Sequence, residues 1–394
     1  MIFLPPHVTA LPTPPRPKRV LFVTDFYQEE VLDGIVDHAG PAGWELIANM
    51  RFHGKFPGET EADGILAVAI EDRVREWLEK WKGTPVVNIG APYPGLEGPS
   101  VNTDYMEAAR TGARHLMELG HTSFAFYSLT DFTESPAIFA AYQNELAKFN
   151  LTVTHANFAA VHGRDAIDVP RAERLRWLAD QLLALKKPLA VMSDDDRRSL
   201  ELIAACNMAG LRVPEDVSIL GCENRSVECR MARVPLSSVD MNWRGVGRAA
   251  AALLERLMVG HPAETDQLQV PTRGVVARAS TATFVTESEG ITRSILHIRQ
   301  HFPESMKMKD LAQMAGMTER SFRTEFKRLV GRSPRSEIQR ARLASACSLL
   351  RDTDLKLDAI AMESGFGTAQ KLCEVFAETL GTTPGGWRQK ARQI

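Results

Sequence analysis

Hydrophobic and polar positions near the C-terminus follow a pattern that occurs twice. In each copy a short apolar-periodic segment stops at a Gly, and a Thr then opens a longer amphipathic segment, at residues 315–326 and again at 364–376. Gly316 corresponds to Gly365, and one further residue is added in the second turn. A Gly suits the left-handed end of a helix and a Thr caps the start of the next one. The repeat therefore predicts two helix-turn-helix units.

The longer segment of each copy has an apolar and a polar face. In the first copy Phe322, Phe326 and Leu329 lie at i, i+4 and i+7 and share the predicted inner face. The polar face of that copy carries Arg320, Arg323, Thr324 and Lys327. The second copy places Leu372, Val375 and Phe376 inside and Gln370, Lys371 and Glu374 outside. A helix of this kind presents long hydrogen-bond donors to a major groove while its apolar face docks on a partner helix.

A third amphipathic segment lies between the two copies. Residues 336–350 read as one long helix, with Ile338, Leu343, Ala346 and Leu350 on its buried side. Such a helix would hold the two units at a fixed spacing. A single match to this pattern would as readily describe a plain helical hairpin with a solvated face, but the repetition favours DNA binding.

These residues resemble the DNA-binding domain of AraC-type transcription regulators. The resemblance rests on "MKDLAQMAGMTERSFRTEFKRLVGRSP", on "LLRDTDLKLDAIAMESGFG" and on the closing "GTTPGGWR", and it covers about residues 291–390. It implies an all-α domain whose two helix-turn-helix units meet successive major grooves of double-stranded DNA, about 10 bp apart.

The charge of the chain is unevenly divided. Residues 291–394 contain 18 Lys and Arg against 11 Asp and Glu, a net charge of +7, whereas the rest carries −9 and the whole chain −2. Basic side chains near phosphates release counterions and supply most sequence-independent affinity for DNA. The two readers also differ, because the second has Glu374 where the resemblance would often place a donor. We therefore expect Arg320 and Arg323 to supply most base discrimination, and Gln370 and Lys371 to set the register.

The larger N-terminal part alternates apolar runs with helical patterns. The runs at 19–26, 64–70, 85–90, 123–129, 189–195 and 217–222 read as buried parallel strands. Strand–helix alternation of this length predicts an open, doubly wound sheet, in two lobes. Ligands of such folds bind beyond the C-terminal strand ends, often in the cleft between lobes.

Three stretches of this part resemble the ligand-binding core of LacI-type repressors, which is itself similar to periplasmic sugar-binding proteins. They are "ARHLMELGHTSFAFY", "AGLRVPEDVSILGCEN" and "PLSSVDMNWRGVGRAAAALLERLM". Together the two resemblances predict an α/β two-lobed periplasmic-binding-protein-like sensor domain followed by an all-α AraC-type double helix-turn-helix domain. This layout is similar to that of regulators of the xylose-operon type.

We expect four segments along the chain. They are a disordered tail at 1–17, the LacI-type ligand-binding domain at 18–282, a linker at 283–290 and the DNA-binding domain at 291–394. The tail holds six prolines and lacks the features of a signal peptide, and no stretch approaches the ~20 apolar residues of a membrane span. Five scattered cysteines without a CxxC pair favour reduced thiols, so we expect a cytoplasmic protein without a metal or other cofactor.

The candidate effector-binding residues stand where the predicted strands end. They are Asp25, Phe26 and Tyr27 after the first strand, Asp195 and Asp196 after the fifth, and Glu223 and Asn224 after the sixth. Carboxylates and amides bond sugar hydroxyls, and an aromatic ring can cover a sugar. The acidic residues could instead serve the dipole of the following helix, and Phe26 could be ordinary core. Ile138 stands where the LacI-type resemblance implies an Arg, and Glu223 departs from its usual "G.D[ND]".

The expected function is a ligand-responsive transcription regulator, of the sugar-sensing, xylose type, that activates a carbohydrate catabolic operon. The expected partners are an operator duplex, a small-molecule effector, a second copy of the chain in a homodimer and, for an activator, RNA polymerase. A non-sugar ligand or a vestigial cleft is the alternative. The sequence contains no P-loop, GxGxxG, HExxH or GxSxG motif, so an enzyme is not expected.

Overall fold

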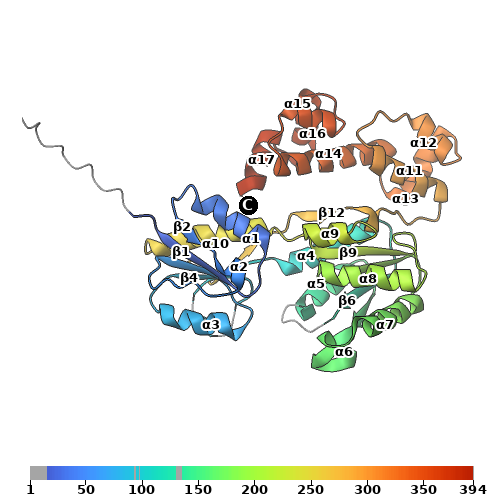
Figure 1. Ribbon diagram of the computed structural model, residues 1–394. Coiled ribbons are helices and arrows are strands. Elements are labelled where there is room, and N and C mark those ends of the chain that lie inside the picture. The colour runs from blue at the N-terminus through green and yellow to red at the C-terminus, as the bar shows by residue number, and fades with distance from the viewer. Residues whose placement is uncertain (1–15, 93–94, 97, 130–134, 394) are drawn as a thin grey trace, which may run out of the picture. The chain divides into compact units, whose positions relative to one another are not determined.

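The computed structural model describes residues 16–92, 95–96, 98–129 and 135–393 (Figure 1). Nearly all of the expected N-terminal tail, residues 1–17, lies outside the described residues. The chain divides into two units, Met1–Thr103 with Asn242–Val270, and Asp104–Met241 with Pro271–Ile394. We call the described part of the first unit the first lobe. Within the second unit, residues 104–241 and 271–282 form the second lobe and residues 283–393 the C-terminal helical domain.

The first lobe is built on a parallel six-stranded sheet in the order β11-β5-β4-β3-β1-β2. Its strands are β1 (Arg19–Thr24), β2 (Glu45–Ile47), β3 (Gly64–Val68), β4 (Val86–Ile89), β5 (Ser100–Thr103) and β11 (Gln267–Val270). Helices α1 (Glu29–Ala39) and α10 (Trp243–Met258) cover one face, and α2 (Met50–His53) and α3 (Asp72–Leu78) the other (Figure 1). Leu21 and Val23 pack in the core on the α3 side. Because both faces are covered, the central strands are continuously apolar.

Helices α1 and α10 approach each other so closely that two positions require Gly. A Cβ atom at Gly34 would lie 2.0 Å from the backbone oxygen of Arg244, and one at Gly247 would lie 2.0 Å from the backbone oxygen of Val31. Two ion pairs flank the contact, because Asp37 accepts from Arg244 at 2.7 Å and from Arg248 at 2.9 Å. These guanidinium groups lower the pKa of Asp37 to about 2.

The second lobe is built on a mixed six-stranded sheet in the order β12-β10-β9-β8-β6-β7, in which only β12 runs antiparallel to its neighbour. Its strands are β6 (Phe124–Ser128), β7 (Val153–Asn157), β8 (Leu189–Ser193), β9 (Val217–Glu223), β10 (Ser237–Asp240) and β12 (Gly274–Val276). Its helices are α4 (Tyr105–Glu118), α5 (Ser135–Ala147), α6 (Phe158–His162), α7 (Arg171–Ala184), α8 (Asp196–Met208) and α9 (Ser226–Met231). Gly112 lets α4 lie directly on the sheet, because a Cβ there would stand 2.5 Å from the Met192 sulfur.

The C-terminal helical domain contains two small cores joined by one long helix. Its helices are α11 (Glu289–His301), α12 (Met308–Met314), α13 (Glu319–Val330), α14 (Pro334–Asp352), α15 (Leu357–Glu363), α16 (Ala369–Leu380) and α17 (Pro384–Gln393). Phe322 and Phe326 of α13 pack in the first core and Phe376 of α16 in the second. The helix α14 contributes Ile338 to the first core and Leu343 to the second.

The predicted fold class is confirmed, since two α/β lobes are followed by an all-α domain with the expected helical repeat. Each of the six predicted apolar runs contains a strand, and the four predicted inner positions of α14 are buried. Six further strands, β2, β5, β7, β10, β11 and β12, each of three to five residues, were not predicted. In the segment expected to be a linker, 283–290, Phe284 is buried in the first helical core and the Val285 N–H donates to Leu119 at 2.7 Å.

The close approach of α1 and α10 makes the first lobe sensitive to one methyl group. Gly247→Ala places a Cβ against backbone, which no side-chain rotation can relieve, so we expect a destabilisation of about 1–3 kcal/mol. Thermal melting of the full chain measures it. The matched control is Gly40→Ala, because Gly40 has ordinary helical φ and its nearest atom would be 3.6 Å from the new Cβ. Equal melting temperatures for the two variants would contradict the packing argument.

Candidate DNA-reading helices and effector site

The first candidate reader is α13, and its four predicted contact residues are all exposed. Its N-cap, Thr318, accepts a hydrogen bond from the Ser321 amide at 3.2 Å, as the sequence predicted. Arg323 makes a long contact of 3.3 Å with Glu319, and the Thr324 hydroxyl donates to the backbone oxygen of Arg320 at 3.1 Å. Within the described part of the chain, Arg320 and Lys327 form no ion pair. The polar face of α13 therefore presents guanidinium and ammonium groups that are free to bind.

Both turns use a Gly with positive φ, but the two positions differ in their surroundings. Gly316 has φ +68° and open space around it, whereas Gly365 has φ +80° and a Cβ there would stand 2.5 Å from Pro303. The second turn therefore requires Gly for its backbone conformation and for the close approach of the chain after α11.

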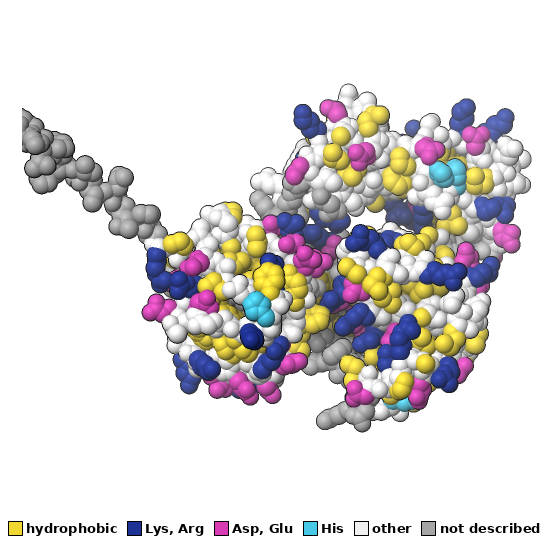
Figure 2. All heavy atoms as spheres, viewed as in Figure 1, with side chains coloured by type: hydrophobic (Ala, Val, Ile, Leu, Met, Phe, Trp, Pro, Cys, Tyr) yellow, Lys and Arg dark blue, Asp and Glu magenta, His cyan; other side chains and the backbone are white. Residues whose placement is uncertain are grey.

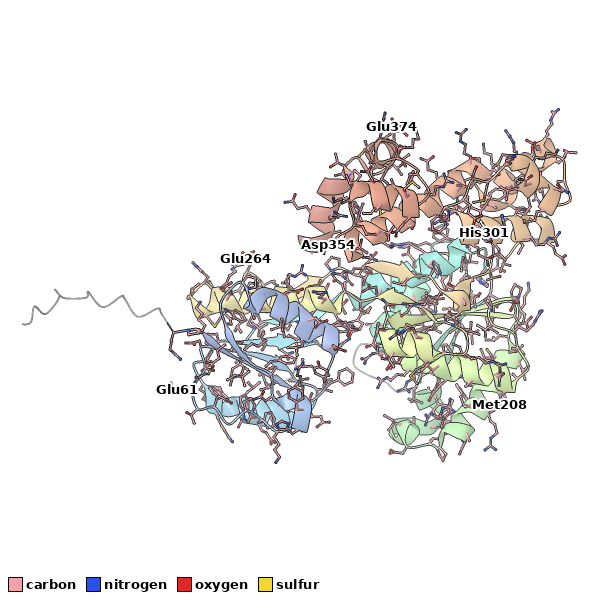
Figure 3. The ribbon with its side chains drawn as sticks, turned by 45° about the horizontal axis from the view of Figure 1, so that its top comes forward. Glu61, Met208, Glu264, His301, Asp354 and Glu374 are labelled. Carbon is pink, nitrogen blue, oxygen red and sulfur yellow. The ribbon has the colours of Figure 1, made fainter. Side chains whose placement is uncertain are left out.

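In the second candidate reader, α16, two donor side chains are bonded to an acceptor on the same helix. Glu374 lies on the outer side of the helix (Figure 3), where it accepts from Lys371 at 3.0 Å and from Gln370 at 3.2 Å. The hydrogen bond from Lys371 is the main cause of a lowered pKa of Glu374, which stays ionised. The donors expected to set the register are thus occupied by a carboxylate on the same face. A carboxylate can accept from cytosine but is repelled by phosphate, so we expect α16 to be the weaker of the two readers.

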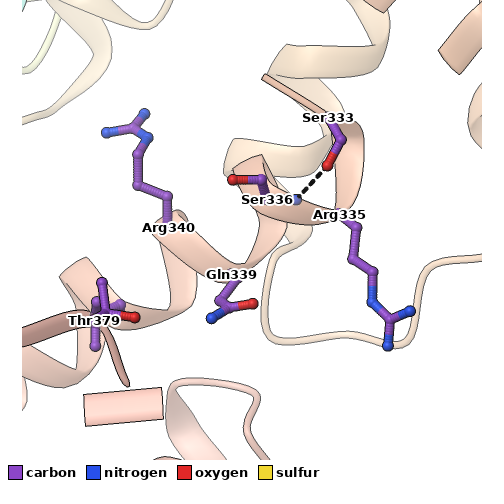
Figure 4. Close-up of a pocket in the computed structure, with 7 residues that line it drawn as sticks. Ser333, Arg335, Ser336, Gln339, Arg340 and Thr379 are labelled. Carbon is purple, nitrogen blue, oxygen red and sulfur yellow. Dashed lines mark hydrogen bonds between the residues drawn. The ribbon is translucent and has the colours of Figure 1, made fainter. Parts of the chain in front are cut away.

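Basic side chains project from the surface of the C-terminal helical domain, as Figure 2 shows in dark blue. An open hollow of about 420 Å³ lies between α14 and the end of α16. It is lined by Ser333, Arg335, Ser336, Gln339, Arg340, Leu343 and Thr379 (Figure 4). Ser333 caps α14 by accepting from the Ser336 amide at 3.2 Å. Six of the seven lining residues have polar side chains, but most of the exposed lining surface is apolar.

In the first lobe the three candidate residues follow β1. The Asp25 carboxylate accepts from the backbone N–H groups of Ile70 and Glu71, at 3.1 and 2.8 Å, and burial raises its pKa. Asp25 therefore ties the end of β1 to the loop after β3. Phe26 is half-buried, and Tyr27, 40% exposed, offers an aromatic ring to solvent.

In the second lobe the two aspartates at the end of β8 have different environments. Asp195 is the N-cap of α8, accepts from the Arg198 amide at 2.8 Å and pairs with Arg197 at 2.9 Å. Asp196 has no exposed surface and accepts from the Ser238 hydroxyl at 2.6 Å and the Arg225 amide at 2.7 Å. Burial raises the pKa of Asp196 to about 7. Its carboxylate joins α8 to the β9–α9 turn.

The end of β9 carries a strained backbone and an ion pair. Glu223 has φ +106° and Asn224 φ +57°, and the first value is uncommon for a residue with a side chain. Glu223 pairs with Arg225, and the Asn224 side chain accepts from Arg278 at 2.8 Å. Strain of this kind costs on the order of 1–3 kcal/mol and clusters at binding sites.

Sequence reasoning missed the arginines that accompany these acidic and amide groups: Arg197, Arg225 and Arg278. The first two each stand two residues after their carboxylate, so the spacing was visible, but their side chains could have pointed elsewhere. Arg278 comes from a distant segment and left no local signal. Asp194 immediately precedes the candidate pair Asp195 and Asp196. Its Oδ2 accepts from Ser135 at 3.1 Å, its buried Oδ1 has no partner within the described residues, and burial raises its pKa to about 7.

Comparisons with known proteins agree with this architecture. Residues 113–281 match the periplasmic binding protein-like domain family, and residues 311–390 match a helix-turn-helix domain family. The chain is 26% identical over 378 residues to the xylose operon regulatory protein of Escherichia coli strain K12, which covers 93% of this chain and 95% of the relative. It is 23% identical over 376 residues to the protein of the same name from Haemophilus influenzae, with 92% and 95% covered. This chain is similar over nearly its whole length to the xylose operon regulators.

Solved structures show the same fold. A xylose-binding transcription activator matches with a TM-score of 0.59 and 22% identity, over 95% of this chain and 98% of that one. The regulator CelR in complex with cellobiose matches with a TM-score of 0.52 and 22% identity, over 68% of this chain and 86% of that one. The first match spans all three parts of this chain and the second spans two thirds of it. Among the residues that the structure describes, no helix is long and apolar enough to cross a bilayer.

The exposed guanidinium groups of α13 are expected to carry base discrimination. Arg320→Ala and Arg323→Ala should each weaken binding to the preferred duplex by about 1–3 kcal/mol and relax base preference at one position. Selection from random duplexes followed by titration measures both. Lys309→Ala on α12 is the control, and it should weaken binding equally for all sequences. Unchanged affinity and preference in both Arg variants would exclude α13 as the main reader.

The carboxylate of α16 is expected to oppose binding. Glu374→Gln releases Lys371 and removes a charge that phosphate repels, so DNA affinity should rise about threefold or more and the salt dependence should steepen by about one counterion. The control is Glu378→Gln, which removes an equal charge from the same exposed helix without breaking a pair to Lys371. If both variants gained equally, net charge alone would explain the effect.

Proposed function

We propose that this protein is a sugar-responsive DNA-binding transcription regulator of a carbohydrate catabolic operon, of which a pentose such as D-xylose is the first candidate effector. The observation that carries the proposal is the union, in one chain, of a periplasmic-binding-protein-like domain and two helix-turn-helix units. The relatives that match over nearly the whole chain are regulators of xylose operons. None of the relatives named above is an enzyme by its name.

On the DNA side, we infer that α13 and α16 enter two successive major grooves, as helix-turn-helix recognition helices do. The predicted contacts are Arg320, Arg323, Thr324 and Lys327 from α13, and Gln370 and Lys371 from α16. One chain covers one half-site, so a homodimer on a two-part operator follows. As an activator, the dimer would recruit RNA polymerase, and it would act in the cytoplasm.

On the effector side, we infer that the polar strand ends supply the contacts. The candidates are Asp25, Phe26 and Tyr27 in the first lobe and Asp195, Asp196, Glu223 and Asn224 in the second. Among them Glu223 is the strongest candidate, because its unfavourable φ persists only where the surrounding structure holds it. Asp196 is engaged with Ser238 and contributes by shaping the turn that presents Glu223.

A second candidate function is regulation by a less polar ligand. Ile138 is buried and apolar at the position where related sensors carry an Arg, and Glu223 and Asp195 each have an arginine partner already. These internal pairs reduce the number of groups that a sugar would find free. The proposal above and this alternative predict different outcomes in one experiment.

Thermal melting of the full chain against D-xylose, other pentoses, hexoses, sugar acids and disaccharides tests the function directly. An effector at 100 times its Kd adds about 2.7 kcal/mol to the free energy of unfolding, so the melting temperature should rise with one class of sugar. Glu223→Ala should abolish the shift, whereas Glu173→Ala, at an exposed position of α7, should preserve it. No shift with any sugar would overturn sugar sensing and favour the apolar alternative.

A further inference from the structure

The helix α14, which joins the two helix-turn-helix units, also touches the second lobe at two separate points. Near its start, Arg340 Nη1 lies 3.6 Å from Glu118 Oε2, at the last residue of α4. Near its end, Arg351 Nη1 donates to the backbone oxygen of Arg273 at 3.1 Å. Both contacts lie within the second unit of the chain.

The first contact is at Glu118, the last residue of α4. The other end of α4 follows one of the three crossings, the points where the chain passes from one unit to the other. The chain leaves the first unit at Thr103, and Asp104 is the N-cap of α4, accepting from the Glu107 amide at 2.8 Å. The 14 residues of α4 form a rod of about 21 Å that ends at Glu118. Gly112 lies against the sheet and fixes the rod there. A displacement at the crossing would therefore appear at Glu118 as well.

The end of α4 is fastened to the start of the helical domain. The Val285 N–H donates to the backbone oxygen of Leu119 at 2.7 Å. At Gly120, with φ +84°, a Cβ would stand 2.2 Å from the backbone oxygen of Val285. No other residue fits there, so the chain before α11 runs directly over the end of α4.

The second contact leads to the other two crossings. The chain leaves the first unit for the last time after Val270, and Arg273 follows three residues later. The Arg273 N–H donates at 2.9 Å to the backbone oxygen of Asp240, which stands two residues before Asn242, where the chain re-enters the first unit. The backbone oxygen of Arg273, which accepts from Arg351, therefore lies where the chain segments next to these two crossings are hydrogen-bonded to each other.

The start of α14 is rigidly held by a buried charge. Glu337 has no exposed surface, and its carboxylate accepts from Arg299 of α11 at 3.2 Å, from Arg340 at 3.0 Å and from Arg332. These guanidinium groups lower the pKa of Glu337 to about 2. The Arg340 guanidinium thus contacts Glu337 with Nε and Nη2, and Glu118 with Nη1. A guanidinium is a rigid planar fork, so a movement of Glu118 is passed to the start of α14.

We propose that α14 is the element that couples the sensor to the DNA, with Glu118, Arg340 and Arg351 as positioning residues. All three crossings between the two units end in contacts with this helix. The same helix carries Ile338 in the core beneath α13 and Leu343 in the core beneath α16. A change in the arrangement of the two units re-aims α14 and so alters the placement of the two readers on successive grooves. The proposal rests on the sensing function proposed above, because an effector shifts the two states only through its differential affinity for them.

Two variants test the coupling without disturbing the buried cluster. Glu118→Gln removes a half-exposed charge, and Arg351→Gln removes a donor to one carbonyl. The affinity of the full chain for its selected duplex is measured with and without the sugar that gave the largest melting shift. In the parent the sugar should change the Kd at least fivefold. In each variant this ratio should fall to within twofold of one, while the melting shift with sugar and the affinity of the sugar-free protein stay within twofold of the parent.

Arg335→Gln is the matched control, because Arg335 is exposed on the same helix and forms no ion pair with the described residues. It should change the Kd equally with and without sugar and leave the ratio intact. Arg340→Lys, which keeps the charge, should retain a larger ratio than Arg340→Gln. An unchanged ratio in both Glu118→Gln and Arg351→Gln would overturn the role of α14.

Failure of sugar sensing is distinguished by a second measurement that needs no effector. Coupling is reciprocal, so the selected duplex should slow hydrogen exchange in residues 104–120 and 237–242 of the parent and not in the two variants. Protection in the parent together with no sugar-induced melting shift would retain the coupling and reject only the sugar. Identical exchange in parent and variants would reject the coupling whatever the effector.

Discussion

The placement of both DNA readers depends on the buried carboxylate of Glu337. Three guanidinium groups reach it, from α11, from the turn after α13 and from α14 itself. Removing one partner of a buried ion pair costs about 3–5 kcal/mol, because the remaining charge is left uncompensated. The first helix-turn-helix unit and the joining helix are therefore held as one body. The second unit follows, since α14 supplies the inner side of its core through Leu343 and Leu350.

Charge organises the molecule on two scales. Over the whole chain, residues 291–394 with a net charge of +7 follow a remainder of net −9, which directs nonspecific attraction to DNA to one end. Locally, carboxylates and arginines pair within a few residues, as Asp195 does with Arg197 and Glu223 with Arg225. The exposed face of α16 contains a similar local ion pair, between Lys371 and Glu374. On α13, by contrast, Arg320 and Lys327 form no ion pair with the described residues, so we expect these two cations to be available for DNA.

The repeat, the two lobes and the inner face of each reader could be read from the sequence because they depend on periodicity. Phe322 and Phe326 of α13 are buried where their spacing placed them. Short strands such as β10 and the edge strand β12 were missed, because four and three residues carry too little pattern. Polar partners were also missed. The bond from Arg278 to Asn224 joins residues 54 apart, and no rule of local spacing predicts it.

The same limit applies to functions of individual residues. Gly365 was assigned to a left-handed turn, which is correct, but its contact with Pro303 arises only once α11 is in place. Asp196 is predicted to bind the effector, and its carboxylate also accepts from Ser238 and from the Arg225 amide, which no local spacing indicates. The sequence identifies which polar side chains follow the end of a strand. It does not tell which of several neighbouring carboxylates is turned inward, because that depends on groups brought by other strands.

The discontinuity of the first lobe has a consequence for biosynthesis. Its sheet needs β11 beside β5, and its helix α10 must seat against α1 through Gly34 and Gly247. Helix α10 and strand β11 both lie beyond residue 241, so neither has been synthesised when the first 103 residues leave the ribosome. Until residue 270 has emerged, the nascent first lobe therefore has one sheet edge unpaired and one sheet face covered by α1 alone. The C-terminal helices are translated after residue 270. The order of the chain therefore allows the first lobe to complete its fold before the helical domain is synthesised.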